Sequence, residues 1–283
     1  MKILVIGDAM TDIYWRGQAS RLSPEAPIPV VSVSQVETRS GGAANVANNI
    51  ESMGIQVERI FGGGERILKI RLIASQQVAR ADFDHPQEPI LPNAAFLEAL
   101  ERCDMVVAVD YGKGSLSGIA ALLTACRGKP VLIDPKGHDY SKYMGATLIK
   151  PNLEEMKALV GGWSTQDELD FKARQFLLQS GIESILLTKS SEGMTLYTRT
   201  STLHQPAENK SPVDVSGAGE AALSAYATAL AKGFELGSCL RFASKAAGIA
   251  IGRQGTTVCT EEEVFAIPGT KLGQSYNDGD LVR

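Results

Sequence analysis

Short apolar segments without polar alternation recur along the chain, and each one stops at polar residues or glycine. Segments of this kind are typical of strands that are buried on both faces of a parallel sheet. The clearest are Lys2–Ile6, Met105–Val109, Val131–Ile133, Thr147–Ile149 and Ser184–Leu187. They predict a mainly parallel central sheet.

Segments with helical spacing of apolar residues lie between these strands. They are Ala43–Met53, Ala94–Arg102, Leu116–Cys126, Leu153–Val160, Glu168–Gln179, Ala218–Ala231 and Leu236–Ile251. Strands that alternate with helices are the signature of a doubly wound α/β fold. The sequence therefore predicts an α/β protein with a doubly wound, mainly parallel sheet.

Two regions depart from this rhythm, because residues 27–36 and 69–84 alternate between apolar and polar positions. Alternation is typical of strands with one face in water. We interpret these regions as a small β lid, formed by about residues 12–36 and 69–84 and inserted in a single domain of residues 1–283. The chain shows no internal repeat.

Composition excludes several classes of protein. With 44% hydrophobic and 21% charged residues, the chain is not disordered, and a net charge of −4 gives no reason to expect a nucleic-acid partner. No apolar window approaches the 18 residues of a membrane span. The four cysteines lack C-x-x-C spacing and no histidine lies near them at ligand spacing, so a zinc site is improbable and reduced thiols in the cytoplasm are expected.

Polar residues gather where the predicted strands end. They are Asp8, Asp12, Asp110, Lys113, Asp134, Lys136, Lys150, Asn152 and Lys189. Open α/β sheets bind ligands outside the carboxyl ends of their strands. Polar loops are common in any protein, but so many polar ends favour a binding site.

The segment Pro212–Glu220 (PVDVSGAGE) runs directly into a helix rich in small residues. Backbone amides at a helix start are free to bind an anion, and Gly217, Ala218 and Gly219 would let an anion approach them closely. Glu220 adds a carboxylate at the same place. The alternative is an ordinary glycine-rich helix start with an acidic residue that favours the dipole.

This segment resembles the second signature of the ribokinase (PfkB) carbohydrate kinases, and Ser40–Ile50 (SGGAANVANNI) resembles the first. Within that family, further segments resemble the heptose-7-phosphate kinases of lipopolysaccharide precursor synthesis. They are Ser20–Val31 (SRLSPEAPIPVV), Asp110–Gly114 (DYGKG), Asp134–Gly137 (DPKG) and Lys150–Glu155 (KPNLEE). The resemblance covers residues 1 to about 265, and the common order of its motifs makes it specific.

The resemblance implies transfer of the γ-phosphoryl group of MgATP to the anomeric hydroxyl of D-glycero-β-D-manno-heptose 7-phosphate. It places the catalytic base at Glu220 and the anion hole at Gly217, Ala218 and Gly219. The positions that match sugar-binding residues are Asp12, Gly41, Gly42 and Asn45, with Lys113 and Lys136 as contacts to the substrate phosphate. The positions that match nucleotide-binding residues are Lys150, Asn152, Glu155, Thr188, Lys189 and Gly193.

The resemblance also implies metal ions. Glu155 matches a residue that holds Mg²⁺ through water, and Asp214 and Ser216 match ligands of a K⁺ site. Asn152 and Glu155, three residues apart, are equally a helix-capping pair. Lys113 and Lys136 are equally solvated loop lysines. A homodimer through the lid is expected by resemblance, and the chain would be a kinase without the nucleotidyltransferase to which some relatives are fused.

The sequence departs from the family in two places. The family has Asp where this chain has Glu220, and roughly twenty-five to thirty residues are absent after Val57–Phe61, enough for one helix and one strand. Both departures favour an alternative, a catalytically weak relative that binds nucleotide or sugar phosphate with little turnover. A Rossmann dehydrogenase is a poor fit, since no G-x-G-x-x-G follows the first strand.

Overall fold

The computed structural model describes residues 1–137, 139–208 and 212–266. Its main sheet has eight strands in the order β12-β11-β10-β9-β8-β7-β1-β4. Neighbouring strands from β4 to β10 are parallel, and β11 and β12 are antiparallel. The strands are β1 Lys2–Gly7, β4 Gln56–Phe61, β7 Met105–Val109, β8 Val131–Asp134, β9 Leu148–Ile149, β10 Ser184–Thr188, β11 Met194–Thr198 and β12 Thr202–Gln205.

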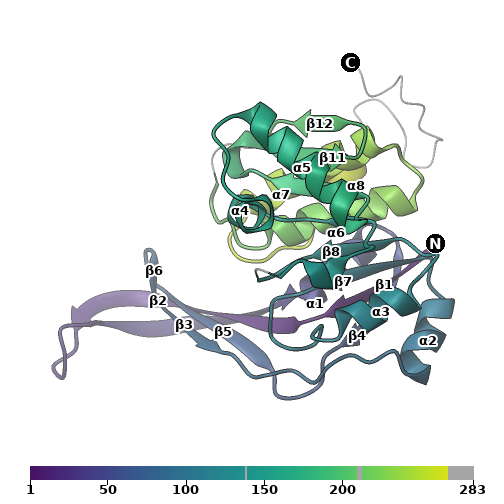
Figure 1. The fold of residues 1–283 in the computed structure, drawn as a ribbon. Helices are drawn as coiled ribbons and strands as arrows, with labels where there is room; N and C mark the ends of the chain where they lie inside the picture. Colours follow the sequence, from purple (N-terminus) through teal and green to yellow (C-terminus); the bar gives the residue numbers. More distant parts are fainter. Residues whose placement is uncertain (138, 209–211, 267–283) are drawn as a thin grey trace.

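Helices cover both faces of this sheet (Figure 1), so the predicted α/β fold class is confirmed. One hydrophobic cluster joins the sheet to α1 (Ala43–Ser52), α6 (Ala218–Ala231), α7 (Leu236–Ile251) and α8 (Glu261–Phe265). A second cluster joins it to α2 (Ala94–Glu101), α3 (Ile119–Ala125), α4 (Leu153–Val160) and α5 (Gln166–Ser180). Among the described residues no helix is long and apolar enough to cross a membrane.

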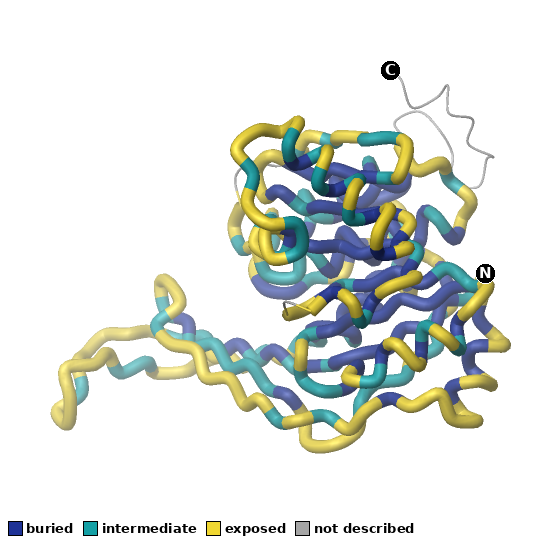
Figure 2. The backbone as a smooth tube through the Cα atoms, viewed as in Figure 1, coloured by how far each residue is buried: buried dark blue, intermediate teal, exposed yellow. Residues whose placement is uncertain are grey.

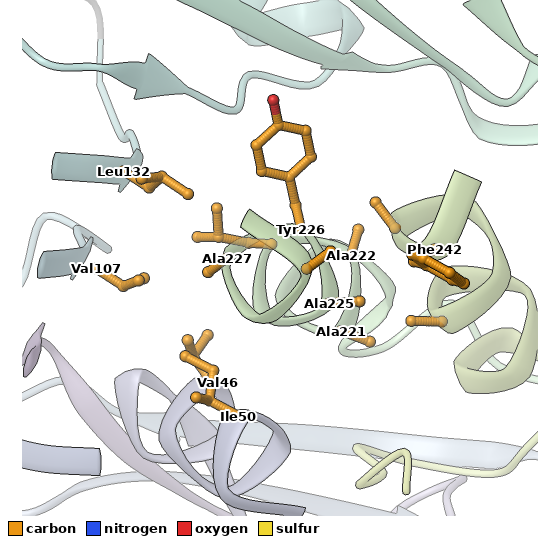
Figure 3. Close-up of a cluster of buried hydrophobic side chains, with 14 of the residues drawn as sticks. Val46, Ile50, Val107, Leu132, Ala221, Ala222, Ala225, Tyr226, Ala227 and Phe242 are labelled. Carbon is orange, nitrogen blue, oxygen red and sulfur yellow. The ribbon is translucent and has the colours of Figure 1, made fainter. Parts of the chain in front are cut away.

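Helix α6 lies at the centre of the first cluster (Figure 3). Its alanines face α1 at Val46 and Ile50, the sheet at Val107 and Leu132, and α7 at Phe242. A helix that is apolar on all sides is a core helix, and small side chains let its neighbours approach closely. The start of α6 is therefore held rigidly by the core.

A second sheet, in the order β3-β2-β5-β6, projects from the body as a lid (Figure 1). Its strands are β2 Ala9–Leu22, β3 Pro29–Gly42, β5 Ile67–Ile73 and β6 Gln77–Phe83. Strands β2 and β3 extend further into the body than the predicted lid of about residues 12–36, since β2 begins at Ala9 and β3 ends at Gly42. Residues 69–84 form a hairpin instead of one strand. The hairpin turns where the Ala74 amide donates to the Gln76 carbonyl at 2.9 Å.

The two faces of the lid differ in chemistry. Asp12, Tyr14, Lys69 and Arg71 share one face, because they alternate along β2 and β5 and pair in register. Ile13, Trp15, Ile70 and Leu72 share the other face. The outer part of the lid is largely exposed (Figure 2). The polar face carries the groups that reach the body of the protein.

Three parts of the body were not predicted, namely the edge strand β4, the β11–β12 hairpin and helix α8. Two predicted helices differ in extent, since α3 begins at Ile119 and α5 begins at Gln166, after a Thr165 side chain that accepts from the Glu168 amide at 3.2 Å. The four cysteines are free and buried, as expected. The last residues of the predicted domain, 267–283, lie outside the described residues.

Candidate active site

Glu220 is the third residue of α6, whose N-cap Gly217 has a φ of 78°. That left-handed conformation suits glycine because it has no Cβ. The core contacts of α6 fix the direction of this turn, and the Glu220 side chain is only 5% exposed. The helix thus delivers a carboxylate into a buried position instead of displaying it to solvent.

Three donors from two other segments, the start of α1 and the loop after β7, meet the Glu220 carboxylate. The Gly42 amide donates to Oε1 at 3.0 Å, and the Tyr111 hydroxyl donates to the same oxygen at 2.6 Å. The Asn45 side-chain amide donates to Oε2 at 2.5 Å. Burial raises the pKa of Glu220 above its usual value, although the Tyr111 and Asn45 hydrogen bonds oppose this effect. A buried carboxylate with a raised pKa is suited to accept a proton.

The residues expected to bind the sugar gather around this carboxylate. Asp12 is buried and forms an ion pair with Arg71. A Cβ on Gly41 would lie 2.4 Å from Asp12 Oδ2, so a larger residue there would displace the Asp12 carboxylate. Gly42 and Asn45 contact Glu220 directly. The sequence predicted all four positions, and the structure brings them together.

The predicted anion hole lies beside a buried ion pair. Lys150 Nζ lies 3.0 Å from Asp134 Oδ1 and 3.0 Å from the position that a Cβ on Gly219 would occupy. Burial raises the pKa of Asp134, while Lys150 opposes the shift. The Ala218 amide donates to the Val215 carbonyl at 3.4 Å, so among the described residues the Gly219 and Glu220 amides are the first-turn donors left for an anion. The Lys150 ammonium group lies beside them, and together these groups suit an anionic ligand.

A cavity of about 490 Å³ opens on the other side of the α6 start. Of the residues predicted to bind nucleotide or phosphoryl groups, Asn152, Thr188, Gly193, Ala218 and Gly219 line it. Its wall also includes α7 residues with small side chains, namely Ser244, Ala247 and Gly248. The cavity is mostly apolar, and it shares Ala218 and Gly219 with the predicted anion hole. Both properties are expected of a nucleotide site.

The other predicted phosphate ligands lie at the margins. Asn152 and Glu155 form a capping box, and the Glu155 carboxylate also pairs with Lys136 at 3.0 Å. Lys113 pairs with Asp84 at the base of the lid, at 2.7 Å. Lys189 turns toward Gln166, 3.2 Å away, and is not among the residues that line the cavity.

Asp214 joins two loops beside the anion hole. Its carboxylate accepts from the Ser216 amide and from the Gly255 amide, each at 2.9 Å. Burial would raise the pKa of Asp214, but the two amide donors outweigh burial and lower it. Asp214 is therefore ionised at neutral pH, and its charge would attract a cation.

Two functional groups were missed by sequence reasoning, Tyr111 and Arg71. Tyr111 lies within the D-Y-G-K-G segment that carried the resemblance, so a signal was present. Arg71 gave no signal, because its partner Asp12 becomes a neighbour only when β2 and β5 pair in parallel. Asp12 was expected to bind the sugar, and in the structure its carboxylate forms an ion pair with Arg71.

The sequence is similar to those of known carbohydrate kinases. A family model described as pfkB family carbohydrate kinase matches residues 60–263. The chain is 40% identical to a D-beta-D-heptose 7-phosphate kinase of Bordetella bronchiseptica, over 93% of this chain and 95% of that protein. It is 39% identical to the bifunctional protein HldE of Methylococcus capsulatus, but spans only 64% of that protein's length.

Solved structures share the fold at lower identity. Arabidopsis thaliana ribokinase, complexed with ribose and ATP, superposes with a TM-score of 0.76 at 19% identity, covering 93% of this chain and 97% of that one. Phosphofructokinase-2 from Escherichia coli, in complex with potassium, gives 0.73 at 17% identity, covering 94% and 96% of the two chains. At such identities the likeness shows the fold alone.

The alignments also reveal a deletion. The alignment to the Bordetella kinase runs over 296 residues, whereas 93% of this 283-residue chain is about 263 residues. About 33 alignment positions therefore have no counterpart in this chain. Their number is close to the roughly twenty-five to thirty residues predicted to be absent after Val57–Phe61, where only residues 62–66 separate β4 from β5.

Proposed function

Because this chain belongs to the pfkB family of carbohydrate kinases, we propose that it transfers the γ-phosphoryl group of ATP to the anomeric hydroxyl of D-glycero-β-D-manno-heptose 7-phosphate. One observation carries the proposal. The Glu220 carboxylate lies buried against Gly42 and Asn45 of the predicted sugar site, and the two residues before it, Ala218 and Gly219, line a cavity of about 490 Å³ that could hold a nucleotide. The product would be a lipopolysaccharide precursor, and an ATP-dependent step of this kind is expected in the cytoplasm.

The sugar binds on the lid side of Glu220 in this proposal. Asp12 and Asn45 bind its hydroxyl groups, and the backbone at Gly41 and Gly42 lets the ring approach closely. Glu220 then accepts the proton of the attacking hydroxyl. General base catalysis by a positioned side chain contributes typically about 10²–10⁴-fold in rate. Lys113 lies at the base of the lid, where it would meet the substrate's own phosphate.

ATP occupies the cavity, with its phosphates directed at Gly217, Ala218 and Gly219. The first-turn amides and Lys150 bind the transferring group and compensate its charge. Asn152, Thr188 and Gly193 line the nucleotide path, with Lys189 behind it and Lys136 beside Glu155 at the phosphate end.

The donor set suits Mg²⁺ held mainly by substrate. Among the described residues no three His, Cys, Asp or Glu side chains gather into a metal cage. Mg²⁺ usually binds through one or two carboxylates, water and substrate phosphates, so Glu155 at the cavity margin is a sufficient protein contribution. When bound, Mg²⁺ would neutralise the negative charge that develops during phosphoryl transfer. Asp214, with Ser216, would hold K⁺.

A homodimer through the apolar face of the lid completes the proposal. Trp15, Val36 and Phe83 are 39%, 61% and 45% exposed on or beside this face. Large exposed apolar side chains gathered on one surface mark an interaction site, and a two-fold axis would pair the surface with itself. A concentration-dependent mass by analytical ultracentrifugation, lost in Trp15→Glu, is the expected result.

The proposed activity is tested by ADP release from ATP with and without heptose 7-phosphate. Substrate-dependent release at rates of about 1–100 s⁻¹, typical of kinases, is expected. The second candidate is a weakened relative, which the Glu220 side chain and the deletion favour. Release below that range that rises in Glu220→Asp would support it, because the substitution restores the family's residue. Binding of both ligands with no release in either protein would exclude turnover.

A further inference from the structure

We propose that the Tyr111 hydroxyl positions the Glu220 carboxylate and reserves Glu220 Oε2 as the oxygen that receives the substrate's proton. The inference deepens the proposed function and rests on it. It assigns a role to a side chain that touches neither sugar nor nucleotide in the scheme above. Tyr111 is thus a positioning residue, acting through Glu220.

The backbone at Tyr111 is fixed by a buried carboxylate. Tyr111 follows β7, and its amide donates to Asp8 Oδ2 at 2.9 Å. Asp8 is fully buried and also accepts from the amides of Lys113 and Ser115, at 3.0 Å and 3.1 Å. With its loop tied at three points, Tyr111 presents its hydroxyl to Glu220 Oε1 at 2.6 Å.

The two carboxylate oxygens of Glu220 differ in the number of hydrogen bonds that they accept. An ionised carboxylate oxygen has about two lone-pair positions. Oε1 accepts from the Gly42 amide and from Tyr111, so both of its positions are used. Oε2 accepts only from Asn45 among the described residues, which leaves one position open. Oε2 is therefore the oxygen available to an incoming hydroxyl.

The transfer step balances at this oxygen. The substrate O–H bond breaks and its proton moves to Oε2. The hydroxyl oxygen uses the freed electron pair to bond to the γ-phosphorus, and the bond from that phosphorus to the β–γ bridging oxygen breaks, leaving its electrons on ADP. Throughout, Oε1 keeps its two donors, so the carboxylate does not rotate.

Protonation states agree with this division. Burial and the Glu220 charge raise the pKa of Tyr111 well above its usual value, so the phenol stays a donor. The charged groups that face the pair are Asp134, next to Lys150, and Lys69, whose Nζ lies 5.5 Å from the Tyr111 ring centre, with Asp12 beyond it. Loss of the hydroxyl removes a donor to the ionised form, so the pKa of Glu220 should rise.

A carboxyl ¹³C NMR titration, with Glu220 assigned by its absence in Glu220→Gln, tests this directly. In Tyr111→Phe the midpoint should rise by about one to two pH units, the equivalent of one hydrogen bond to a charged group. Tyr140→Phe is the matched control, because the buried Tyr140 hydroxyl has no hydrogen-bond partner in the described part of the chain. Its midpoint should equal that of the unaltered protein.

In a plot of kcat against pH, the midpoint on the acidic side should rise by the same amount in Tyr111→Phe. A merely structural role would lower kcat without moving this midpoint. Glu220→Asp draws the carboxylate back by about one C–C bond, 1.5 Å. Tyr111→Phe should then add no further shift in that background.

An unmoved Glu220 midpoint in a Tyr111→Phe protein that still binds an ATP analogue would overturn the inference. If Tyr111→Phe fails to fold, 3-fluorotyrosine at position 111 replaces it. This more acidic donor should lower the midpoint, and no change would overturn the inference equally. The titration needs no turnover, so a shifted midpoint without ADP release would count against the proposed function and not against the Tyr111 contact.

Discussion

The two sides of Glu220, which we propose bind sugar and nucleotide, are built from different kinds of groups. On the sugar side, polar side chains from separate segments are buried and bonded to one another, as in the pairs Asn45–Glu220 and Asp12–Arg71. On the nucleotide side, a cavity is lined mainly by small and apolar residues, and its polar end is a helix start. Side-chain chemistry dominates one side, while shape and backbone dominate the other.

This contrast has an energetic consequence. A buried polar group that loses its partner costs roughly 1–3 kcal/mol, so the sugar side should discriminate strongly between substrates. An apolar cavity discriminates more weakly, by roughly 1–3 kcal/mol for a methylene that does not fit. Substitutions on the two sides should therefore raise different Michaelis constants, and by different amounts.

The largest effect is expected where the two sides meet. Glu220→Gln keeps the shape of the side chain but removes the proton acceptor, so kcat should fall by about 10²–10⁴-fold. Binding of an ATP analogue, measured by calorimetry, should be unchanged. Glu262→Gln, on the exposed side of α8, is the control and should have no effect on kcat.

The pH dependence of kcat in the unaltered enzyme also tests whether Glu220 is the base. Burial raises the pKa of Glu220, and the base acts only when ionised, so activity should be present above that pKa and lost as the pH falls through it. The midpoint of this loss in kcat should lie above the usual range of a carboxyl group. A midpoint near 4, as for an exposed Glu, would show that another group is the base.

The residues predicted for the nucleotide side rest on local sequence patterns, whereas contacts on the predicted sugar side join residues far apart in the chain. Residues such as Gly217 and Asn152 belong to local patterns, a helix start and a capping pair, which a sequence displays directly. Tyr111 and Glu220 are 109 residues apart in the chain, and their contact depends on the order of strands in the sheet. The partner of Asp12 likewise follows from pairing within the lid, which alternation alone does not specify.

The central strands of the main sheet were predicted because each one displays a local pattern in the sequence. Strands buried on both faces, such as β7, produce apolar runs with sharp polar ends, and the predicted and observed bounds of α6 coincide. In the β11–β12 hairpin, which was missed, β12 is half exposed and carries no apolar run, and β11 is buried but Thr195 interrupts its apolar residues. Partial burial weakens the hydrophobic pattern on which the prediction depends.

A second substitution tests the sugar side alone. Asp12→Ala removes the acceptor for the sugar hydroxyls and leaves Arg71 without its partner, so the sugar KM should rise by about 10- to 100-fold. The ATP KM, measured in the same steady-state assay, is the internal control. It should change by less than about twofold, because distant sites that share no partner affect each other little. Equal increases in both constants would mean that Asp12 serves the fold and not the sugar.

The nucleotide side should respond more weakly. Ala247→Leu extends a side chain from α7 into the cavity, and overpacking there should raise the ATP KM by about tenfold, or 1.4 kcal/mol. Ala120→Leu makes the same change at an exposed position of α3 and should leave both constants unaltered. An increase in the sugar KM in Ala247→Leu would break the proposed separation of the two sides.

The smallest expected effect is stimulation by K⁺, which would act on both sides at once. Asp214 ties the loop before α6 to Gly255, and the Arg39 guanidinium from the lid donates to the Gln254 carbonyl at 2.5 Å and to the Thr256 carbonyl at 3.0 Å. A cation at Asp214 would therefore stiffen a loop that contacts both the lid and the anion hole. The rate in K⁺ should exceed that in tetramethylammonium by about fivefold, the low end of typical coupling between sites. Asp214→Asn should abolish the difference, since it removes the charge that attracts the cation and retains one acceptor oxygen for the loop amides. Equal rates in both salts for the unaltered enzyme would show that the two amides alone order this loop.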